Sequence, residues 1–336
     1  MAKILLVSAI RKAFGAQDLH TSLLGGVETT NIELASRLAE RGHEIILVTP
    51  TNSVTFHDGF KNIPVGDIQG ETADIFISSN ELHAFDLAPR QAKKVLWVHN
   101  PLILERLFRR KQIRPLLQYR PHAVFVGEVL RRRTSGLLPF RRRSTIYHGV
   151  SDVFRNTEPS SGQKKIAVWV SQPQRGLKET LDIWTTRIFP KVPDAEFHIF
   201  GHVEDHLGPD MAKFGEFGVV FHKRASMAEL ATLYRTARMM IFPGARDETF
   251  CLAAAEAQCA GLPVVTRGIG SLSERVKHGV NGIIAQTDEE VGAAAIRLFN
   301  DDELWTMLHQ GALCERVTLN WQNAALMWEY ELGITP

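Results

Sequence analysis

Residues 239–266 read MMIFPGARDETFCLAAAEAQCAGLPVVT, and this stretch decides the fold. Its first four residues form an apolar run that ends at Pro243-Gly244, as a short buried strand does. An alanine-rich segment follows and is closed by Gly261, which is typical of a helix and its carboxy-terminal cap. Leu262–Thr266 is a second short apolar run. The pattern predicts one strand, loop, helix and strand of a parallel sheet.

Two carboxylates lie in this stretch, Glu248 at the start of the expected helix over residues 248–260 and Glu256 two turns later. On one continuous helix they would be about 12 Å apart along the axis and rotated by roughly 80°. A glycosidase-type pair needs roughly 5–10 Å between its carboxyl groups, so this spacing argues against that chemistry. It favours two carboxylates that contact different parts of one elongated ligand, with an anionic group such as phosphate near the helix start.

The chain of 336 residues is long enough for two domains, each with its own core. Its three cysteines, Cys251, Cys259 and Cys314, form no metal-like cluster, which is typical of a reducing compartment. The apolar run in residues 1–8 is too short for a signal peptide, and no run is long enough to cross a membrane. We therefore expect a soluble, cytoplasmic protein.

Charge is unevenly divided along the chain. Residues 1–155 carry 22 Lys and Arg against 14 Asp and Glu, whereas the remainder carries 17 against 23. Within residues 90–143, fifteen bases accompany only Glu105 and Glu128, which predicts a basic face. This face has three interpretations: a solvated surface, a nucleic-acid surface, or a dock for an anionic membrane or an anionic glycan acceptor. Residues 131–143 interleave too few aromatics for nucleic acid, whereas leucines and Phe108 among the arginines of residues 102–114 favour a membrane.

Strand and helix patterns alternate along both halves of the chain. Strands are expected at residues 3–8, 44–49, 74–78, 94–99 and 122–126, and then at 165–171, 196–200, 219–222, 238–242, 264–266 and 282–285. Helices are expected at residues 27–41, 102–113 and 130–137, and then at 176–187, 227–235, 248–260, 272–278 and 289–299, with a nearly all-helical end from 301. Residues 151–164 are the expected linker. The alternation predicts two doubly wound parallel sheets in tandem.

Three features that follow expected strands have chemical potential. Gly25-Gly26 opens a helix after the first strand, where backbone N–H groups meet phosphate, although a glycine-permitted turn explains the pair equally well. Arg175 and Lys178 follow the first strand of the second half and suit either a diphosphate or a solvated helix entry. His99 ends a strand, where a single histidine is as readily structural. Neither G-x-G-x-x-G nor G-x-x-x-x-G-K-[ST] occurs, which removes the main support for dinucleotide and NTPase sites.

Taken together, these residues resemble the family 4 glycosyltransferases. The amino-terminal signature of that family resembles Leu24–Glu28 with Ala39–Glu44, and the carboxy-terminal E-x7-E signature resembles Glu248 to Glu256 and the residues up to Val265. The match continues through Gly270–Glu274 and Gly279–Gly282. Three positions depart from the usual pattern: Cys251 replaces a glycine, His148 replaces an asparagine, and the loop 171–176 carries one cation before its glycine.

The resemblance implies a GT-B fold, in which two Rossmann-like, doubly wound parallel-sheet domains face each other across a cleft. The expected domains are residues 1–155 on the acceptor side and residues 156–316 on the donor side, with residues 317–336 as a helix that crosses back to the first domain. The implied reaction is a retaining transfer of a sugar from a UDP-, GDP- or ADP-type nucleotide-sugar. The implied acceptor is a hydroxyl of a glycan, glycolipid or lipid-linked molecule in bacterial surface polysaccharide or glycoconjugate synthesis.

The resemblance assigns catalytic roles to four residues. His99 would lie beside the donor sugar, and Glu248 would contact the hydroxyl groups of that sugar. Arg175 and Lys178 would neutralise the leaving nucleoside diphosphate, a task that a metal ion performs in other transferases. No D-x-D metal motif stands at an expected strand end. We therefore expect no metal and no cofactor.

Six further positions would bind the nucleotide-sugar. Glu256 would hold the ribose hydroxyls, Gly25 and Gly26 would approach the diphosphate, and the backbone of Thr249-Phe250-Cys251 would line the sugar end. The other expected partners are a glycan or lipid-linked acceptor and an anionic membrane surface at residues 90–143, which places the protein in the cytoplasm at the inner face of the plasma membrane. No nucleic-acid partner is expected. The sequence leaves open the donor, the acceptor and the oligomeric state, because variable loops such as residues 51–70 and 201–218 would make those contacts.

Two other functions fit the same residues. A sugar-nucleotide epimerase or a phosphorylase of the same architecture would yield an epimer or a sugar phosphate rather than transfer to an acceptor. A non-catalytic binding protein would use the basic face alone. Replacing Glu248 or Glu256 by alanine separates these functions, because an enzyme should lose turnover whereas a basic-patch binder should keep its affinity.

Overall fold

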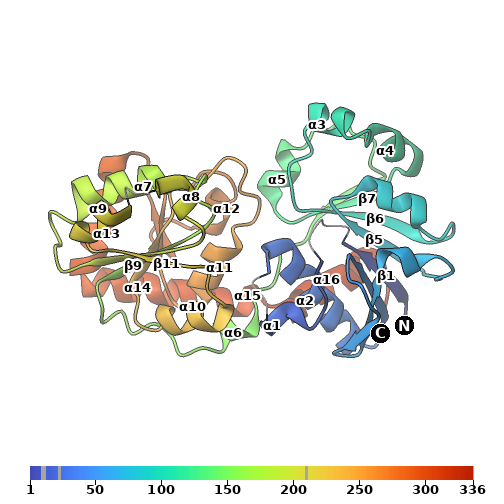
Figure 1. Ribbon diagram of the computed structural model, residues 1–336, viewed down its shortest axis with the longest axis horizontal. Coiled ribbons are helices and arrows are strands. Elements are labelled where there is room, and N and C mark those ends of the chain that lie inside the picture. The colour runs from blue at the N-terminus through green and yellow to red at the C-terminus, as the bar shows by residue number, and fades with distance from the viewer. Residues whose placement is uncertain (9–12, 22–23, 209–210, 336) are drawn as a thin grey trace. The chain divides into compact units, whose positions relative to one another are not determined.

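The computed structural model describes residues 1–8, 13–21, 24–208 and 211–335, which fold into two compact units. Unit 1 comprises residues 1–149 and 321–336, and unit 2 comprises residues 150–320 (Figure 1). Unit 2 is therefore one continuous segment, whereas unit 1 is built from both ends of the chain. The expected loop before Leu24 and the expected loop over residues 201–218 lie partly outside the described residues.

Eight described strands form the sheet of unit 1, in the order β3-β4-β2-β1-β5-β6-β7-β8. They are β1 (Lys3–Val7), β2 (Glu44–Thr49), β3 (Thr55–His57), β4 (Phe60–Pro64), β5 (Ile75–Ser79), β6 (Lys93–Val98), β7 (His122–Phe125) and β8 (Arg142–Thr145). Neighbours pair in parallel except in the antiparallel hairpin β3–β4. The strand order reverses at β1, so the sheet is doubly wound as predicted. Its central strands are apolar runs buried on both faces, as parallel sheets require.

The helices of unit 1 are α1 (Asp18–Thr21), α2 (Gly26–Glu40), α3 (Leu104–Arg109), α4 (Ile113–Tyr119), α5 (Glu128–Arg133) and α16 (Trp321–Leu332), with short 3-10 segments η1 (Val65–Ile68) and η2 (Leu82–Leu87). Helix α2 buries Ile32, Leu34 and Leu38 against the core. It ends before Gly42, whose left-handed backbone (φ 89°) lets the chain turn into β2. The predicted helix over residues 27–41 is thus confirmed to within one residue at each end.

Helix α16, the last of the chain, belongs to unit 1 and packs against α2. Trp328 is fully buried and meets Trp97 of β6 edge to face, with ring centroids 5.2 Å apart. Glu329 accepts hydrogen bonds from Arg41 and His43. Burial would raise the pKa of Glu329, but the hydrogen bonds and charges of these partners outweigh it and lower that pKa. An aromatic contact and a buried ion pair therefore anchor this helix.

Two expectations for unit 1 were wrong. The single helix expected over residues 102–113 is two helices, because Lys111 adopts a left-handed conformation (φ 55°) and turns the chain between α3 and α4. Pro115 lies in the first turn of α4, where its missing N–H is harmless. The β3–β4 hairpin lies in residues 51–70, which the sequence pattern assigned to a variable loop.

Unit 2 contains a second sheet of described strands, in the order β11-β10-β9-β12-β13-β14. They are β9 (Ile166–Val170), β10 (Glu196–Phe200), β11 (Val219–His222), β12 (Met239–Ile241), β13 (Val264–Thr266) and β14 (Gly282–Ile284). All neighbours pair in parallel. Every strand overlaps a predicted one, and the order again reverses at its first strand. The prediction of two doubly wound parallel sheets is confirmed.

The helices of unit 2 are α6 (Asp152–Arg155), α7 (Leu177–Ile183), α8 (Glu204–Leu207), α9 (Met211–Phe214), α10 (Met227–Tyr234), α11 (Leu252–Cys259), α12 (Leu272–Arg275), α13 (Asp288–Asn300), α14 (Asp302–Leu313) and α15 (Glu315–Thr318), with a π-helical turn η3 (Trp184–Ile188) and a 3-10 turn η5 (Gly215–Phe217). Trp184 is fully buried and stacks on Phe197 of β10, with ring centroids 4.8 Å apart. Its indole N–H donates to the carbonyl of Phe217 at 2.7 Å. This ring joins the helical layer to the sheet.

The expected linker, residues 151–164, is a packed part of unit 2. Phe154 of α6 meets Tyr234 of α10, with ring centroids 5.8 Å apart, and the N–H of Ser160 donates to the carbonyl of Ala260. A Cβ at Gly162 would lie 2.4 Å from the ring of Trp305. The two compact units divide the chain at 149/150 and 320/321, whereas the bounds expected from the resemblance were 155/156 and 316/317.

Candidate functional site

Arg175 and Glu248 meet in unit 2. Arg175 follows β9 and Glu248 follows β12; these strands are neighbours, and the strand order reverses between them, at the kind of crevice where doubly wound sheets bind ligands. Nη1 of Arg175 donates to Oε2 of Glu248 at 2.7 Å. Nε of Arg175 is buried and has no hydrogen-bond partner among the described residues. Two of the four predicted catalytic side chains therefore form one ion pair.

Glu248 is buried, with 8% of its surface exposed. Burial raises the pKa of Glu248, and the negative charge of Asp247 adds to this rise. The charge of Arg175 and hydrogen bonds from the backbone N–H groups of Cys251 and Thr249 lower that pKa. The net pKa shift is upward. One guanidinium and two backbone donors thus orient a carboxyl group that is poorly hydrated.

The conformation of Cys251 determines where α11 begins. Its backbone is left-handed (φ 60°, ψ 68°), which costs a non-glycine residue about 1–2 kcal/mol, and the helix starts only at Leu252. The predicted helix over residues 248–260 is therefore wrong at its amino-terminal end, since Glu248 lies in the preceding loop. The separation of about 12 Å that a continuous helix would give Glu248 and Glu256 does not apply.

Glu256 lies on α11 and is partly exposed. Burial of its carboxyl group raises the pKa of Glu256 to about 8. We find no hydrogen bond or ion pair to this carboxyl group within the described ranges. The hydroxyl of Tyr234 is buried without a hydrogen-bond partner in the same part of the chain, and burial followed by the charge of Glu256 raises the pKa of Tyr234 well above its usual value. Glu256 is thus an acceptor without an internal partner that can serve a ligand.

The loop that backs Glu248 was missed as a functional element by sequence reasoning. Gly270 has φ 67°, and a Cβ there would lie 2.4 Å from the carbonyl oxygen of Ala245 and 2.9 Å from that of Glu248. The N–H of Ser271 donates to the carbonyl of Glu248 at 3.1 Å. Only glycine fits this approach, so Gly268-x-Gly270 in the sequence was the signal that could have identified it.

Among the described residues, Lys178 makes no hydrogen bond or ion pair with Arg175 or Glu248. It lies on α7 and is exposed, two residues beyond Gly176, whose left-handed backbone (φ 95°) precedes the helix. In the described part of the protein we find no ion pair of Lys178. Its predicted role beside a diphosphate remains a prediction.

In unit 1, Gly25 and Gly26 form the start of α2. Gly25 is the N-cap residue, with an extended backbone, and its helix start receives no side-chain cap. A Cβ at Gly25 would meet the carboxylate of Glu28 at 2.5 Å. The backbone N–H groups of this first turn are therefore arranged as anion-binding helix starts are.

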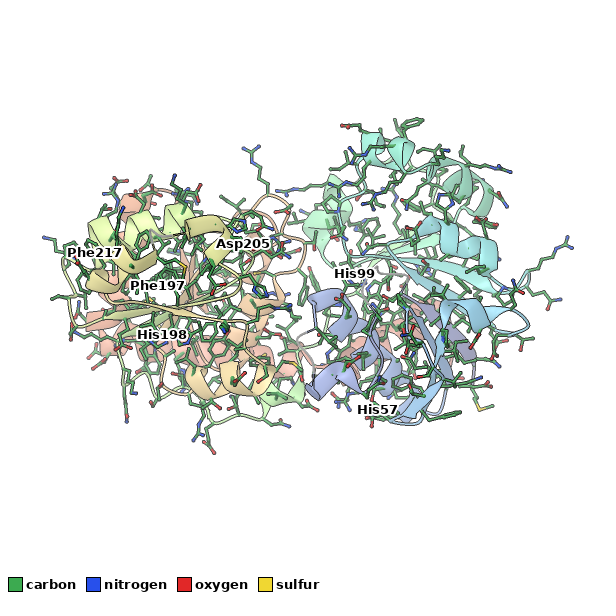
Figure 2. All side chains as sticks on the ribbon, viewed as in Figure 1. His57, His99, Phe197, His198, Asp205 and Phe217 are labelled. Atoms are coloured by element: carbon green, nitrogen blue, oxygen red, sulfur yellow. The ribbon has the colours of Figure 1, made fainter. Side chains whose placement is uncertain are left out.

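His99 follows β6 in unit 1 and is buried (Figure 2). The backbone N–H of His99 donates to Oδ1 of Asn80 at 2.8 Å. The imidazole ring packs on Trp97 and stacks on His148. Burial lowers the pKa of His99 to about 3, so the imidazole is neutral at physiological pH. Nε2 has no hydrogen-bond partner among the described residues. Asn80, whose left-handed backbone (φ 62°) turns the chain after β5, is a positioning residue that sequence reasoning missed.

Residues 164–301 match the model of a protein family described as glycosyl transferases group 1. The matched segment runs from the residues before β9 to the end of α13 and includes Arg175, Glu248 and Glu256. This segment of the chain is therefore similar to group 1 glycosyltransferases. This agrees with the family that the sequence motifs indicated.

Two curated proteins similar to this chain are both described as D-inositol 3-phosphate glycosyltransferases. D-inositol 3-phosphate glycosyltransferase 1 of Catenulispora acidiphila is 37% identical over 98 residues, which cover 29% of this chain and 23% of that protein. D-inositol 3-phosphate glycosyltransferase of Streptomyces griseus is 35% identical over 117 residues, which cover 34% of this chain and 25% of that protein. The chain thus spans about a quarter of the length of the curated relatives it matches.

Solved structures share the fold of this chain. Sucrose-phosphate synthase from Thermosynechococcus elongatus superimposes with a TM-score of 0.76 at 14% identity, over 98% of each chain. HepE from Anabaena, in complex with UDP and glucose, superimposes with a TM-score of 0.74 at 14% identity, over 99% of this chain and all of that chain. The fold is GT-B, as the motif resemblance implied.

Two kinds of feature are absent from the described residues. No helix in the described ranges is long and apolar enough to span a bilayer. Among the described side chains, no three of His, Cys, Asp and Glu are grouped so that they could hold a metal ion.

Proposed function

We propose that the protein is a retaining glycosyltransferase. It moves a sugar from a UDP-, GDP- or ADP-type nucleotide-sugar to a hydroxyl of a glycan, glycolipid or lipid-linked acceptor. The observation that carries this proposal is the Arg175–Glu248 pair at the strand-order reversal of unit 2. A guanidinium suits a diphosphate, and an oriented carboxyl group suits sugar hydroxyls.

The residues of unit 2 then divide the donor between them. Arg175, whose Nε is an unused buried donor, neutralises the diphosphate together with Lys178. Glu248 accepts hydrogen bonds from donor-sugar hydroxyls, with the backbone of Thr249-Phe250-Cys251 lining the same end. Glu256 holds the ribose hydroxyls, and its otherwise unsatisfied, desolvated carboxyl group supports that role.

The residues of unit 1 serve the sugar and the diphosphate. The neutral imidazole of His99 offers Nε2 to the transferring sugar, and the uncapped start of α2 at Gly25-Gly26 faces phosphate oxygens. An imidazole that stays uncharged binds a sugar hydroxyl without adding a cation beside the developing oxocarbenium ion.

In the proposed reaction the acceptor oxygen forms a bond to the anomeric carbon while the bond from that carbon to the diphosphate oxygen breaks. The bonding electron pair leaves with the diphosphate, and the acceptor proton passes to a leaving phosphate oxygen on the same face. Arg175 and Lys178 stabilise the charge that develops on the diphosphate without reorganising. We propose that this needs no metal and no cofactor.

The relatives support the choice of donor and the general setting. HepE from Anabaena has been solved with UDP-glucose, and a further solved neighbour, WaaG, is described as a glycosyltransferase involved in lipopolysaccharide biosynthesis. We therefore propose a role in bacterial surface polysaccharide or glycoconjugate synthesis. The protein would work in the cytoplasm, peripherally attached to the inner face of the plasma membrane through its basic region.

A panel of nucleotide-sugars tested for protection against thermal unfolding examines the proposal directly. The matching donor should raise the unfolding midpoint, and a ligand at 100 times its Kd should add about 2.7 kcal/mol to the free energy of unfolding. Arg175→Gln and Glu256→Ala should reduce this protection, whereas Lys191→Gln, a surface change in the same unit, should not. A chelator should leave it unchanged.

Product analysis separates the enzymatic alternatives. Transfer to an alcohol acceptor with retained anomeric configuration supports the proposal, whereas an epimer or a sugar phosphate as sole product indicates an epimerase or a phosphorylase. If no nucleotide-sugar changed the unfolding midpoint, the donor site would be wrongly assigned.

A further inference from the structure

Five cations of the basic region of unit 1 lie together on α3, α4 and the turn between them. Six other bases in residues 90–143 have partners within the unit: Lys93, Lys94 and Arg143 donate to backbone carbonyls, Arg131 and Arg132 pair with Glu128, and Arg142 pairs with Glu331. The five on α3, α4 and the turn between them are exposed and pair with no carboxylate of the described chain: Arg106, Arg109, Arg110, Lys111 and Arg114. Glu105 is the one acid in residues 103–118.

Large apolar side chains are exposed among these cations. Ile103, Leu104, Phe108 and Leu117 expose between 45% and 65% of their surface. The core contacts of the same helices are made by other residues, Leu107 and Leu116, which are buried. The four exposed apolar side chains therefore do not contribute to the core of unit 1. We call residues 103–118 the α3–α4 surface.

This surface is held on a fixed base. Nε2 of Gln112 donates to Glu81 at 2.8 Å, and the hydroxyl of Tyr119 donates to Asp86 at 2.8 Å. The ring of His83 hydrogen-bonds the carbonyl of Arg110 at 3.1 Å. All three bonds tie α3 and α4 to η2 or the residue before it, so the exposed apolar side chains are presented by a braced pair of helices.

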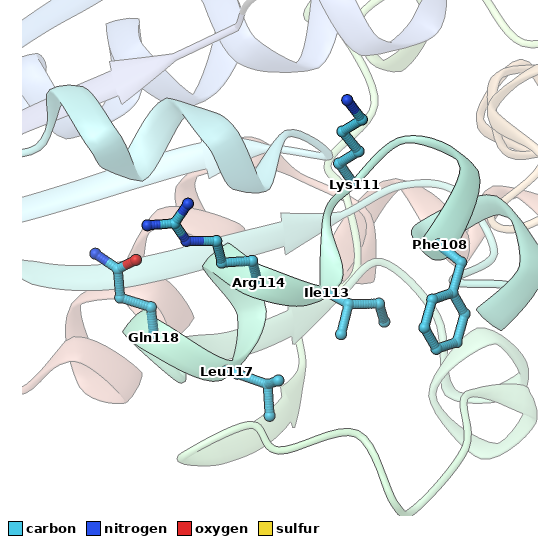
Figure 3. A pocket seen from close by; sticks show the side chains of 6 residues that line it. All are labelled: Phe108, Lys111, Ile113, Arg114, Leu117 and Gln118. Atoms are coloured by element: carbon cyan, nitrogen blue, oxygen red, sulfur yellow. The ribbon is translucent and has the colours of Figure 1, made fainter.

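The two helices enclose an open hollow of about 630 Å³, lined by Phe108, Lys111, Ile113, Arg114, Leu117 and Gln118. In Figure 3 the side chains of Phe108, Ile113 and Leu117 point to one side of the helices, and that of Lys111 points to the other. Exposed apolar side chains on helices that also carry exposed, unpaired cations match the boundary between phosphate headgroups and acyl chains.

Other occupants fit less well. A purely solvated surface has no use for four exposed large apolar side chains placed together. A single-stranded nucleic acid needs aromatic stacking platforms, and Phe108 is the one exposed aromatic ring among the described residues of this surface. A hydrophobic partner helix would not require five unpaired cations.

We propose that the α3–α4 surface docks on a lipid bilayer that contains anionic lipids. Phe108 and Leu117 enter the headgroup region, and the five cations contact lipid phosphates. This deepens the proposed function, on which it rests, because it narrows the membrane contact from residues 90–143 to residues 103–118. It also assigns a task to bases that the proposed donor site does not use.

Vesicle co-sedimentation of the full chain tests the proposal. Vesicles of phosphatidylcholine alone should leave the protein in the supernatant, and vesicles of equimolar phosphatidylcholine and phosphatidylglycerol should pellet it. Each cation near the surface contributes roughly a factor of five to binding. The triple variant Arg106→Gln, Arg109→Gln, Lys111→Gln should therefore weaken binding on the order of a hundredfold. Phe108→Ser with Leu117→Ser should weaken it at least tenfold.

Matched controls remove charge and apolar area elsewhere. Lys164→Gln, Lys191→Gln, Lys223→Gln changes the net charge equally with exposed residues of unit 2, and Phe56→Ser removes an exposed aromatic from the β3–β4 hairpin. Both should bind vesicles like the unchanged protein. Because all substituted side chains are exposed, unfolding midpoints should also stay unchanged, which guards against variants that fail to fold.

Three results would overturn the proposal: no binding to either vesicle, equal loss in the charge control, or full binding by the Phe108→Ser, Leu117→Ser variant. Protection of the same variants against thermal unfolding by nucleotide-sugars tests the donor site separately from the membrane surface. Vesicle binding without any protection would count against the proposed donor site alone. Protection without vesicle binding would count against the α3–α4 surface alone.

Discussion

At the scale of single residues, Cys251 explains why α11 begins at Leu252 and not at Glu248, where the sequence predicted its start. A left-handed residue before α11 ends the preceding loop, and the N–H groups of Thr249 and Cys251 reach Glu248. The family motif usually has glycine here, which adopts this conformation without a steric penalty. The chain thus retains the shape of the motif at a conformational cost.

We expect Cys251→Gly to be more stable than Cys251→Ala by about 1 kcal/mol, because both lose the thiol but only alanine keeps the left-handed penalty. Cys259, buried within α11, is the matched control. There the order should reverse, and alanine should be the more stable by about 1 kcal/mol. Denaturant unfolding of the four variants measures this. If the alanine variant were the more stable at both positions, Cys251 would carry no backbone strain.

Glu256 should make stability depend on pH. Its folded pKa of about 8 lies above the ordinary value of 4.5, so the folded state holds a proton that the unfolded state has lost between these two pH values. Unfolding free energy should therefore fall as pH rises from about 4.5 to about 8 and change no further above that range. Glu256→Gln should remove this slope and gain a few kcal/mol relative to the unchanged protein at pH 9.

Urea unfolding at pH 5 and pH 9 measures the effect of Glu256. The exposed Glu303→Gln in α14 is the control and should show the same pH dependence as the unchanged protein. A parallel pH dependence of Glu256→Gln and the unchanged protein would mean that water reaches this carboxyl group freely.

At the scale of secondary-structure elements, α16 completes the core of unit 1 with Trp328. We expect Trp328→Ala to lower the free energy of unfolding by about 3–5 kcal/mol, since it leaves a cavity against Trp97. Tyr330→Ala, on the same helix but 80% exposed, should change it by less than about 0.5 kcal/mol. Hydrogen exchange of residues 321–332 and denaturant unfolding report the difference. Similar losses from both variants would contradict the anchoring role of Trp328.

Elements with a clear local pattern of apolar residues were predictable from the sequence. Buried parallel strands such as β2, β10 and β13 are short, largely apolar runs, and their predicted bounds agree with the structure. The errors arise where backbone conformation departs from residue preference. Lys111 and Cys251 are left-handed without being glycine, so no composition signal marked the ends of α3 and the start of α11.

The chemical content of the candidate site was only partly predictable. Motif spacing identified Arg175 and Glu248, and the structure pairs them. The support from Gly270, Ser271 and Asn80 depends on close approach between loops that are distant in sequence, which no local pattern records. The pKa values of His99 and Glu256 arise from burial, and burial is a property of the folded chain.

At the scale of the whole molecule, the two units differ in how they are assembled from the chain. Unit 2 is one continuous segment with its own sheet and core, so residues 150–320 should fold alone with one cooperative thermal transition. Residues 1–149 alone lack α16 and should expose Trp97. Circular dichroism melting and tryptophan fluorescence of both fragments test this, and adding a peptide of residues 321–335 should restore a cooperative transition to the first. A sharp transition for residues 1–149 without the peptide would contradict the expectation.

The assignment of α16 to unit 1 also has a consequence for biosynthesis. The ribosome must translate all of unit 2 between the two parts of unit 1, which takes on the order of 10–30 s at roughly 5–20 residues per second. Nascent chains arrested after residue 320 should therefore be more protease-sensitive in residues 1–149 than full-length chains. During that interval the surface of Trp97 has no covering helix, so the segment made first becomes complete last and depends on chaperones until translation ends.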